Sequence, residues 1–133
     1  MEFYLVGHSN VAVYLQLVQQ VKQALRLGRL EPGEQLPTVR EVSAALAINP
    51  HTVLKAYREL ELTGLVEGRA GQGTFVRESA PGRSLTRQAV LQREFVGWVR
   101  RARTAGWDRD DVIALVDTTL WAEFDRAEGE GIA

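Results

Sequence analysis

The pattern of apolar and polar residues divides the chain into a helical N-terminal part, a short hairpin and two further helices. Between residues 11 and 27 the apolar side chains recur at spacings of three and four, which is typical of one face of an amphipathic helix. The positions on that face are Val11, Tyr14, Leu15, Val18, Val21 and Leu25. Because Gly28 follows where a helix would end, we predict a first helix over residues 11–27.

Two shorter helices are expected next. Thr38 and Glu41 have the spacing of a capping box, which predicts a helix over residues 39–47. Asn49 is a strong N-cap residue, and Pro50 suits the first helical position, where its missing N–H has no cost. A further helix should therefore begin at Pro50.

This helix from Pro50 is expected to end near Thr63, because Gly64 follows. Its inward-facing side chains would be Val53, Ala56, Tyr57 and Leu60. Small Ala44 and Ala45 are expected where the two short helices cross. Two helices so close in sequence predict a helix-turn-helix.

The next segment has the pattern of a hairpin. LVEG and TFVR are two short strand-like runs around the glycine-rich stretch RAGQG. Three helices followed by a hairpin make a winged helix, which residues 11–77 would fill. We therefore predict a winged helix-turn-helix domain over residues 1–77.

The composition changes after residue 77, where we predict a linker over 78–84 and a two-helix module over 85–133. Ser84 and Asp108 are the expected helix caps. The apolar stripes of the two helices contain Leu91, Phe95, Trp98, Ala102, Val112, Val116, Leu120 and Phe124. Two helices cannot bury both stripes alone, so they need the winged helix or another subunit. The predicted fold class is mainly α with a small β-hairpin, and the module is expected to mediate dimerisation.

Composition excludes several kinds of site. The 133 residues include no cysteine and only two histidines, His8 and His51, so no thiolate site can form, and no multi-histidine metal site can form within one chain. We expect no metal, no cofactor and no catalytic residues. No apolar run reaches the roughly 18 residues that a membrane span needs, and no secretory signal precedes the first helix. The expected location is the cytoplasm, without a membrane partner.

The second helix of a helix-turn-helix places its N-terminal residues against base edges in the major groove. The candidate DNA contacts in and around it are Arg40, Asn49, Pro50, His51, Thr52, Lys55 and Arg58. The first turn of this helix also offers N–H groups to a phosphate. At the hairpin, Arg69, Gly71 and Gln72 could enter a minor groove. The net charge of −1 indicates that any attraction to DNA must be local.

Each of these residues also has a purely structural explanation. Lys55 and Arg58 could be a solvated face, with Arg58 paired to Glu59 or Glu61. Arg40 opposes the dipole of its helix, and a local pair with Glu34 would explain it. The glycines of the hairpin are what any tight turn requires.

Taken together, the motifs resemble the DNA-binding domain of the GntR family of bacterial transcriptional regulators. The resemblance rests on the segments PGEQLPTVRE, INPHTV, AYRELELTGLV and GQGTFV and covers residues 11–77. It implies that Arg40 contacts operator DNA, together with residues 49–52 at the turn and Ala70 and Gly71 at the wing tip. Pro50 and Ala70 depart from the side chains common in the family, so we expect little base readout from them, and Arg69 or Gln72 could compensate.

The tail indicates a subfamily. About 50 residues after the linker are too few for the large effector domains of the family, and the tail lacks the histidines of their metal site. Its length and helical pattern resemble the YtrA subfamily, which implies dimerisation and regulation of a transporter operon. Trp98, Trp107 and Trp121 mark where we would look for a small-molecule effector.

The sequence thus predicts a transcriptional repressor that binds palindromic double-stranded operator DNA as a homodimer, although a tetramer would also cover the apolar stripes. The alternative is a winged helix that serves as a protein–protein interaction module without specific DNA binding. An apolar patch in place of Arg40 and the polar cluster at 49–55 would favour that alternative.

Overall fold

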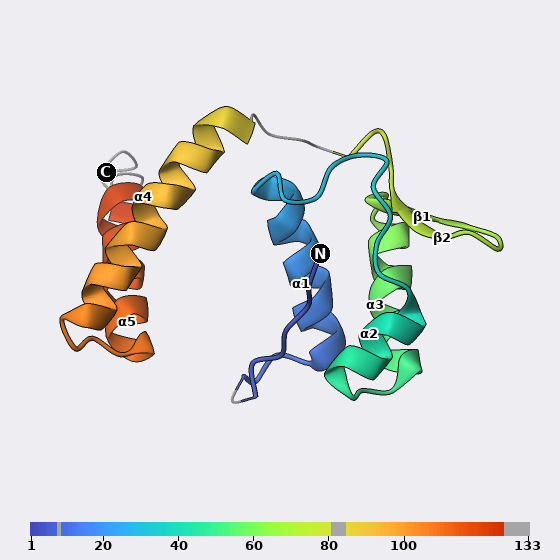
Figure 1. The fold of residues 1–133 in the computed structure, drawn as a ribbon, viewed down its shortest axis with the longest axis horizontal. Coiled ribbons are helices and arrows are strands. Elements are labelled where there is room, and N and C mark those ends of the chain that lie inside the picture. The colour runs from blue at the N-terminus through green and yellow to red at the C-terminus, as the bar shows by residue number, and fades with distance from the viewer. Residues whose placement is uncertain (8, 81–84, 127–133) are drawn as a thin grey trace. The chain divides into compact units, whose positions relative to one another are not determined.

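The computed structural model describes residues 1–7, 9–80 and 85–126, and the chain forms two compact units, Met1–Gln88 and Ala89–Ala133 (Figure 1). The elements in order are α1 (Val13–Arg26), α2 (Val39–Leu46), α3 (Pro50–Leu62), β1 (Val66–Arg69), β2 (Gly73–Val76), α4 (Leu85–Thr104), α5 (Arg109–Leu120) and the π-helical turn η1 (Trp121–Asp125). The predicted fold class, mainly α with a two-stranded hairpin, is confirmed.

Three stretches that the predictions touch lie outside the described residues. They are His8, residues 81–84 of the predicted linker with the expected cap Ser84, and residues 127–133 of the predicted C-terminal module. The domain boundaries at 77 and 84 therefore stay predictions.

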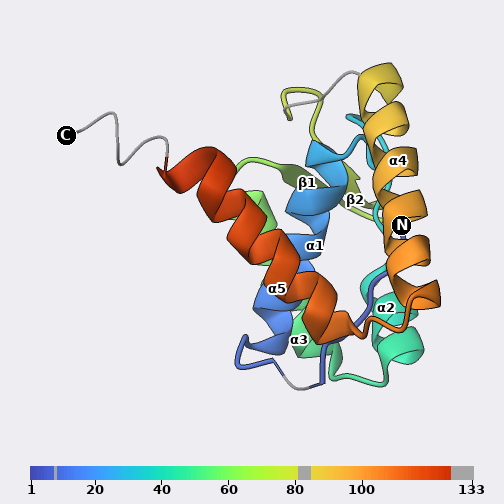
Figure 2. The same cartoon turned by 90° about the vertical axis from the view of Figure 1, so that its left-hand side faces the viewer.

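The N-terminal unit has one apolar core to which all three helices and the hairpin contribute. Leu17 and Val21 of α1, Val53 and Leu60 of α3 and Val66 of β1 are completely buried. Helix α1 packs along α3, as Figure 1 and Figure 2 both show, and α2 also packs against α3. The predicted inward stripe of α3 is confirmed, since all four of its members are buried.

The predicted starts of the two short helices are confirmed. The Thr38 hydroxyl accepts a hydrogen bond from the Glu41 N–H at 3.1 Å, and the Asn49 side chain accepts one from the His51 N–H at 2.9 Å. Between them, Ala47 adopts a left-handed conformation with φ of 53°, which ends α2 and allows the sharp turn. The turn between α2 and α3 is short because Asn49, the cap of α3, follows Ala47 by only two residues.

Two details of the predicted packing are wrong. Val11 and Leu15 are exposed, and the buried face of α1 is instead centred on Leu17, which the predicted stripe omitted. Ala44 and Ala45 are exposed as well, and the buried residue of α2 is Val42. Both errors have one cause, because a helix with apolar residues around much of its circumference allows two neighbouring stripes, and only the packing partner selects one.

An ordered N-terminal segment explains why the face of α1 is rotated. The Gln16 Oε1 accepts from the Val6 N–H at 2.9 Å, and the Gln20 Oε1 accepts from the Tyr4 N–H at 3.0 Å. The Gln20 Nε2 also donates to the Tyr4 carbonyl at 2.7 Å. Two buried glutamines one turn apart thus satisfy the backbone of residues 4–6, which polar residues must do when they are buried.

The hairpin is held on one edge by the segment that precedes α2. β1 and β2 pair antiparallel, with Val66 opposite Val76 and Arg69 opposite Gly73. The Leu36 N–H donates to the Thr74 carbonyl at 2.9 Å, and the Val76 N–H donates to the Glu34 carbonyl at 2.8 Å. Residues 34–36 therefore cover the outer edge of β2.

The C-terminal unit consists of the larger part of α4, together with α5 and η1. Asp108 and Asp111 form a capping box at the start of α5, which confirms the predicted cap. The Trp98 ring stacks on Phe95 at 6.1 Å and meets Trp107 edge-on at 5.9 Å between centroids, close to the turn that joins the helices. Away from that turn the two helices diverge (Figure 2). The π-helical turn at residues 121–125 has no signal in the sequence that we recognised.

None of the helices within the described ranges is both long enough and apolar enough to cross a membrane.

Candidate DNA-binding surface

One face of α3 is a polar stripe that points away from the core. Its members are His51, Lys55 and Arg58, whose spacings of four and three place them along one side of the helix, and Leu62 follows on the same side after another four residues. All four are exposed, and Leu62, at the C-terminal end, is 83% exposed. The stripe carries two positive charges and an imidazole, groups that suit phosphates and base edges.

The start of α3 is more fully satisfied than the sequence indicated. The N–H groups of His51 and Thr52 donate to the side-chain and backbone oxygens of Asn49, both at 2.9 Å, and Pro50 has no N–H. The expectation that this turn offers N–H groups to a phosphate is therefore wrong, because the cap has used them. The groups that remain available for contacts with DNA are the side-chain N–H groups of Asn49 and the side chains of His51 and half-buried Thr52.

Arg40 lies at the second position of α2, and its side chain is exposed. Within the described part of the chain, neither Arg40 nor Arg58 forms an ion pair, so the pairings with Glu34, Glu59 and Glu61 that could have explained them are not made. The start of α2 borders the wing, because Thr38 and residues 68–74 line one shallow depression. This arrangement brings the start of α2 and the wing tip to the same part of the surface.

Lys55 is held toward α1 rather than extended freely into solvent. Its Nζ lies 4.0 Å from the centroid of the Tyr14 ring, which is a cation–π contact. The contact keeps the ammonium group at the edge of the polar stripe, and the charge stays available because the side chain is exposed.

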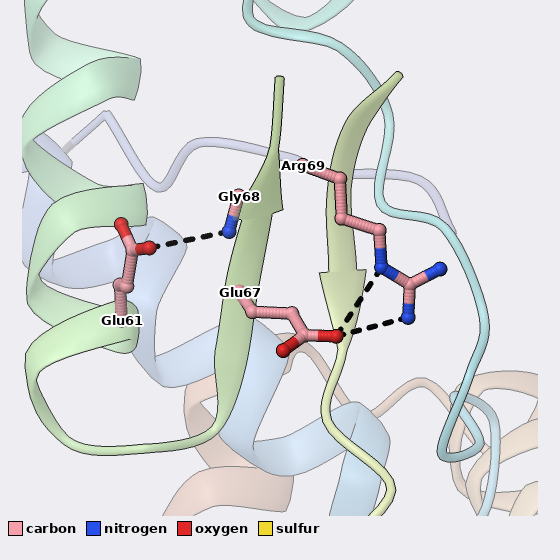
Figure 3. Close-up of polar contacts among 4 residues, drawn as sticks. All are labelled: Glu61, Glu67, Gly68 and Arg69. Carbon is pink, nitrogen blue, oxygen red and sulfur yellow. Dashed lines mark hydrogen bonds and ion pairs between the residues drawn. The ribbon is translucent and has the colours of Figure 1, made fainter. Parts of the chain in front are cut away.

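At the wing, Arg69 is the most constrained of the candidate residues. Its guanidinium donates to the Glu67 Oε1 from Nη2 at 2.9 Å and from Nε at 3.2 Å (Figure 3), and it lies 4.1 Å from the centroid of the Phe75 ring. Ala70, Gly71 and Gln72 form the exposed tip, where Gly71 has a φ of 72° that favours glycine.

Two residues that shape this surface were missed by sequence reasoning. The Glu61 carboxylate accepts from the Gly68 N–H at 3.2 Å, and the Gln35 Nε2 donates to the Gln72 carbonyl at 2.9 Å. One signal for Glu61 was present, since an acidic residue in the last turn of a helix opposes the helix dipole. Gln35 had no such signal.

The C-terminal unit has a second surface of a different kind. Of the eight predicted interface residues, Leu91 is 66% exposed and Phe124 is 63% exposed, and Phe95 and Leu120 are exposed as well. Trp98, Val112 and Val116 are half-buried, whereas Ala102 is buried and leaves little surface for a partner. Further exposed apolar residues lie on the same unit, namely Val90, Val96, Trp107, Ile113, Leu115 and Trp121.

Comparison with known proteins identifies the class that the winged helix and its polar stripe define. The family model described as bacterial regulatory proteins, gntR family, matches residues 13–76. The chain is 43% identical over 72 residues to the HTH-type transcriptional repressor YtrA of Bacillus subtilis (strain 168), a match that covers 54% of this chain and 55% of that protein. The chain thus spans about half the length of that relative.

A longer match is to the uncharacterized HTH-type transcriptional regulator YhcF of the same organism. The identity is 32% over 110 residues, which cover 83% of this chain and 91% of that protein. The chain belongs to the GntR family of bacterial regulatory proteins, and within it to the YtrA subfamily. It is therefore a DNA-binding transcription regulator.

Solved structures agree with this assignment. A transcriptional antiterminator from Listeria monocytogenes EGD-e superimposes with a TM-score of 0.58 at 27% identity and covers 90% of both chains. The crystal structure of AraR(DBD) in complex with operator ORX1 matches 57% of this chain and 95% of that chain with a TM-score of 0.50 at 26% identity. The second of these is a winged-helix domain of the same kind on operator DNA.

Proposed function

We propose that this regulator is a homodimeric repressor that binds a palindromic operator, with α3 in the major groove and the wing beside it. The observation that carries the proposal is the polar stripe His51, Lys55 and Arg58 on the face of α3 opposite the core, with Arg40 exposed and unpaired in the described chain. A named repressor among the relatives supports the sign of regulation.

The proposed roles follow from the chemistry of each side chain. Arg40 and His51 reach base edges, with help from the Asn49 amide and the Thr52 hydroxyl, because these groups can donate hydrogen bonds to N7 and O6 atoms. Lys55 and Arg58 contact phosphates, for which the charge of the side chain matters more than its exact geometry. Pro50 sets the start of the helix and adds no readout. Arg69, Gly71 and Gln72 lie along the minor groove.

Dimerisation is proposed for the C-terminal unit because its helices expose apolar side chains that a monomer would leave in water. Burial of apolar surface contributes about 25 cal/mol per Å², so a second copy that covers Leu91, Phe95, Leu120 and Phe124 would be stabilised strongly. A two-fold dimer reads two half-sites about 10 bp apart, which predicts a palindrome. From the likeness to the YtrA subfamily we also propose that the target is a transporter operon and that the protein acts in the cytoplasm. The binding of a small-molecule effector stays a prediction.

The test is selection of duplexes from a random DNA pool at one stated salt concentration, followed by affinity measurements on the enriched sequence. We expect an enriched palindrome and a loss of about tenfold or more in affinity for Arg40→Ala, because one base-reading arginine contributes about 1–3 kcal/mol. Lys22→Ala removes the same charge from the exposed outer side of α1 and serves as the control.

Two results would contradict the proposal. Equal losses for Arg40→Ala and Lys22→Ala would mean that the arginine acts only through bulk charge. No enriched sequence at low salt, where phosphate contacts are strongest, would favour the protein-interaction alternative.

A further inference from the structure

The two edges of the wing are held in different ways. On the β2 side, residues 34–36 add backbone hydrogen bonds as a third strand would, and Gln35 pairs with Phe75 in an isolated bridge. On the β1 side no further strand is paired in the described chain. The Gly68 N–H points out of that edge, away from β2, toward α3 (Figure 3). An open edge of this kind has an unpaired donor that water or a side chain must satisfy.

Glu61 supplies that partner from the recognition helix itself. Its carboxylate oxygen accepts from the Gly68 N–H at 3.2 Å, across seven positions of the chain. Glu61 lies in the last turn of α3, one residue before the helix ends at Leu62. The bond therefore joins the C-terminal end of α3 directly to the middle of β1, one residue before Arg69.

The wing tip has a second tie from the opposite side. The Gln35 Nε2 donates to the Gln72 carbonyl at 2.9 Å. Gly73, with a φ of 122°, is the position where a side chain would collide with this amide, since a Cβ would lie 2.6 Å from the Gln35 Nε2. The tip at residues 70–72 is thus flanked by a tie on each strand, Gly68 on β1 and Gln72 beside β2.

The charge of Glu61 makes a purely incidental contact a poor explanation. A carboxylate in the last turn of a helix opposes the helix dipole, and the structure has no basic residue in that turn to offset it. On a DNA-binding surface the same negative charge also repels the phosphates. Glu61 is therefore unfavourable in two electrostatic respects, and the hydrogen bond that the structure describes for its side chain goes to Gly68 of the wing.

We propose that Glu61 is a positioning residue that sets the angle of the wing relative to α3, so that both can engage DNA at once. The proposal rests on the proposed function for its DNA part. Its physical basis is preorganisation, because a wing already held in place loses less conformational freedom when it binds. Glu61 itself contacts no DNA in this scheme, and its effect is transmitted through Gly68 to Arg69 and the tip.

The first experiment compares Glu61→Ala with Glu59→Ala on the selected duplex. Both substitutions remove one exposed negative charge from α3, which by itself should strengthen binding. We expect Glu59→Ala to bind as well as the wild type or better, and Glu61→Ala to bind about fivefold more weakly, the equivalent of one hydrogen bond. Glu61→Gln keeps an acceptor oxygen and should recover most of the loss. Equal behaviour of the two alanine variants would overturn the proposal.

A second readout separates positioning from a general loss of stability. The Arg69→Ala substitution weakens the contact between the wing and DNA. In that background, Glu61→Ala should have little further effect on the affinity for DNA. Its effect on the free energy of unfolding should be the same in both backgrounds. A loss of affinity that is additive with Arg69→Ala would mean that Glu61 does not act through the wing.

The tie can also be tested without DNA, which keeps this inference separate from the proposed function. Amide hydrogen exchange of Gly68, measured by NMR, should be about tenfold faster in Glu61→Ala and unchanged in Glu59→Ala, because the tie protects that N–H. Unchanged exchange would refute the tie even if the protein binds its operator. If exchange changes but no operator is found, the proposed function fails and the tie stands.

Discussion

The two units of this chain differ in how far their large apolar side chains are buried. In the N-terminal unit the core contains side chains from α1, α3 and the hairpin that are completely buried, namely Leu17, Val21, Val53, Leu60, Val66 and Val76. In the C-terminal unit Leu91, Phe95 and Phe124 have half or more of their surface exposed. In that unit Trp98 of α4 packs against Trp107 in the turn that precedes α5, and the two helices diverge from there (Figure 2).

This difference supports the proposal that the C-terminal unit forms the dimer interface. Three helices and a hairpin can surround a core, whereas two diverging helices cannot, and the many exposed large apolar residues of the C-terminal unit are what an interface would cover. The N-terminal unit should therefore respond to mutation as a self-contained core, and the C-terminal unit as half of an interface.

The largest expected effect is in the self-contained core. Leu60→Ala should lower the free energy of unfolding by about 3 kcal/mol, because it removes buried methyl groups and leaves a cavity. Urea unfolding measures this loss, and it should be independent of protein concentration. Leu62→Ala is the matched control, since the same substitution two residues further on affects an exposed side chain and should change stability by less than about 0.5 kcal/mol. Similar losses for both would mean that α3 is not packed as described.

A smaller effect is expected at the exposed face of the C-terminal unit. Phe95→Ala should weaken dimerisation by about 2 kcal/mol, or roughly thirtyfold, as is typical of an aromatic residue at the centre of an interface. Sedimentation equilibrium would show the shift from dimer to monomer, while the core of residues 1–80 unfolds as before. Leu62→Ala removes an exposed apolar side chain from the other unit and should leave the dimer intact. A dimer that persists unchanged in Phe95→Ala would move the interface elsewhere.

The smallest effect concerns the one buried phenol of the winged helix. The Tyr57 hydroxyl donates to the Pro37 carbonyl, and Tyr57→Phe should cost about 1 kcal/mol near neutral pH. Burial, and after it the Glu41 carboxylate, raises the pKa of Tyr57 well above its usual value of 10.0. The neutral phenol therefore stabilises the fold fully below pH 10, and this stabilisation is lost as the pH rises toward the folded-state pKa.

The direction of this pH dependence can be tested by urea unfolding between about pH 8 and pH 11, a range around the usual tyrosine pKa of roughly 10. The stability of Tyr57→Phe should fall less steeply at the alkaline end than that of the wild type. Tyr4→Phe alters an exposed tyrosine and should follow the wild-type curve. A wild-type curve no steeper than that of Tyr57→Phe would contradict the assignment of the buried phenol.

Much of the helix-turn-helix could be predicted from local residues. Thr38 and Asn49 cap their helices through bonds that span only two or three positions, and such bonds depend on side chains that are visible in the sequence. Gly64 and Gly71 likewise adopt the positive φ angles that glycine favours. The polar stripe of α3 follows from the same local periodicity, once the buried stripe is known.

The ties of the wing could not be predicted in this way. Glu61 and Gln35 bond to Gly68 and Gln72, partners that lie seven and 37 positions away. The buried Gln16 and Gln20 are a similar case, because a glutamine on an apolar helix face indicates nothing until residues 4–6 are seen to lie across it. Leu15 was assigned to the core for the same reason, since the choice between two stripes depends on what packs against them.

The sequence by itself therefore determined where α2, α3 and α5 begin, the class of the fold, and which polar residues α3 exposes. The tertiary structure alone decided which face of α1 is buried, how Asn49 uses its hydrogen bonds, and how Glu61 and Gln35 hold the wing. The physical reason is the range of the interactions. Caps and periodicity act within a few residues, whereas a face is chosen and a hairpin is oriented by groups that only folding brings together.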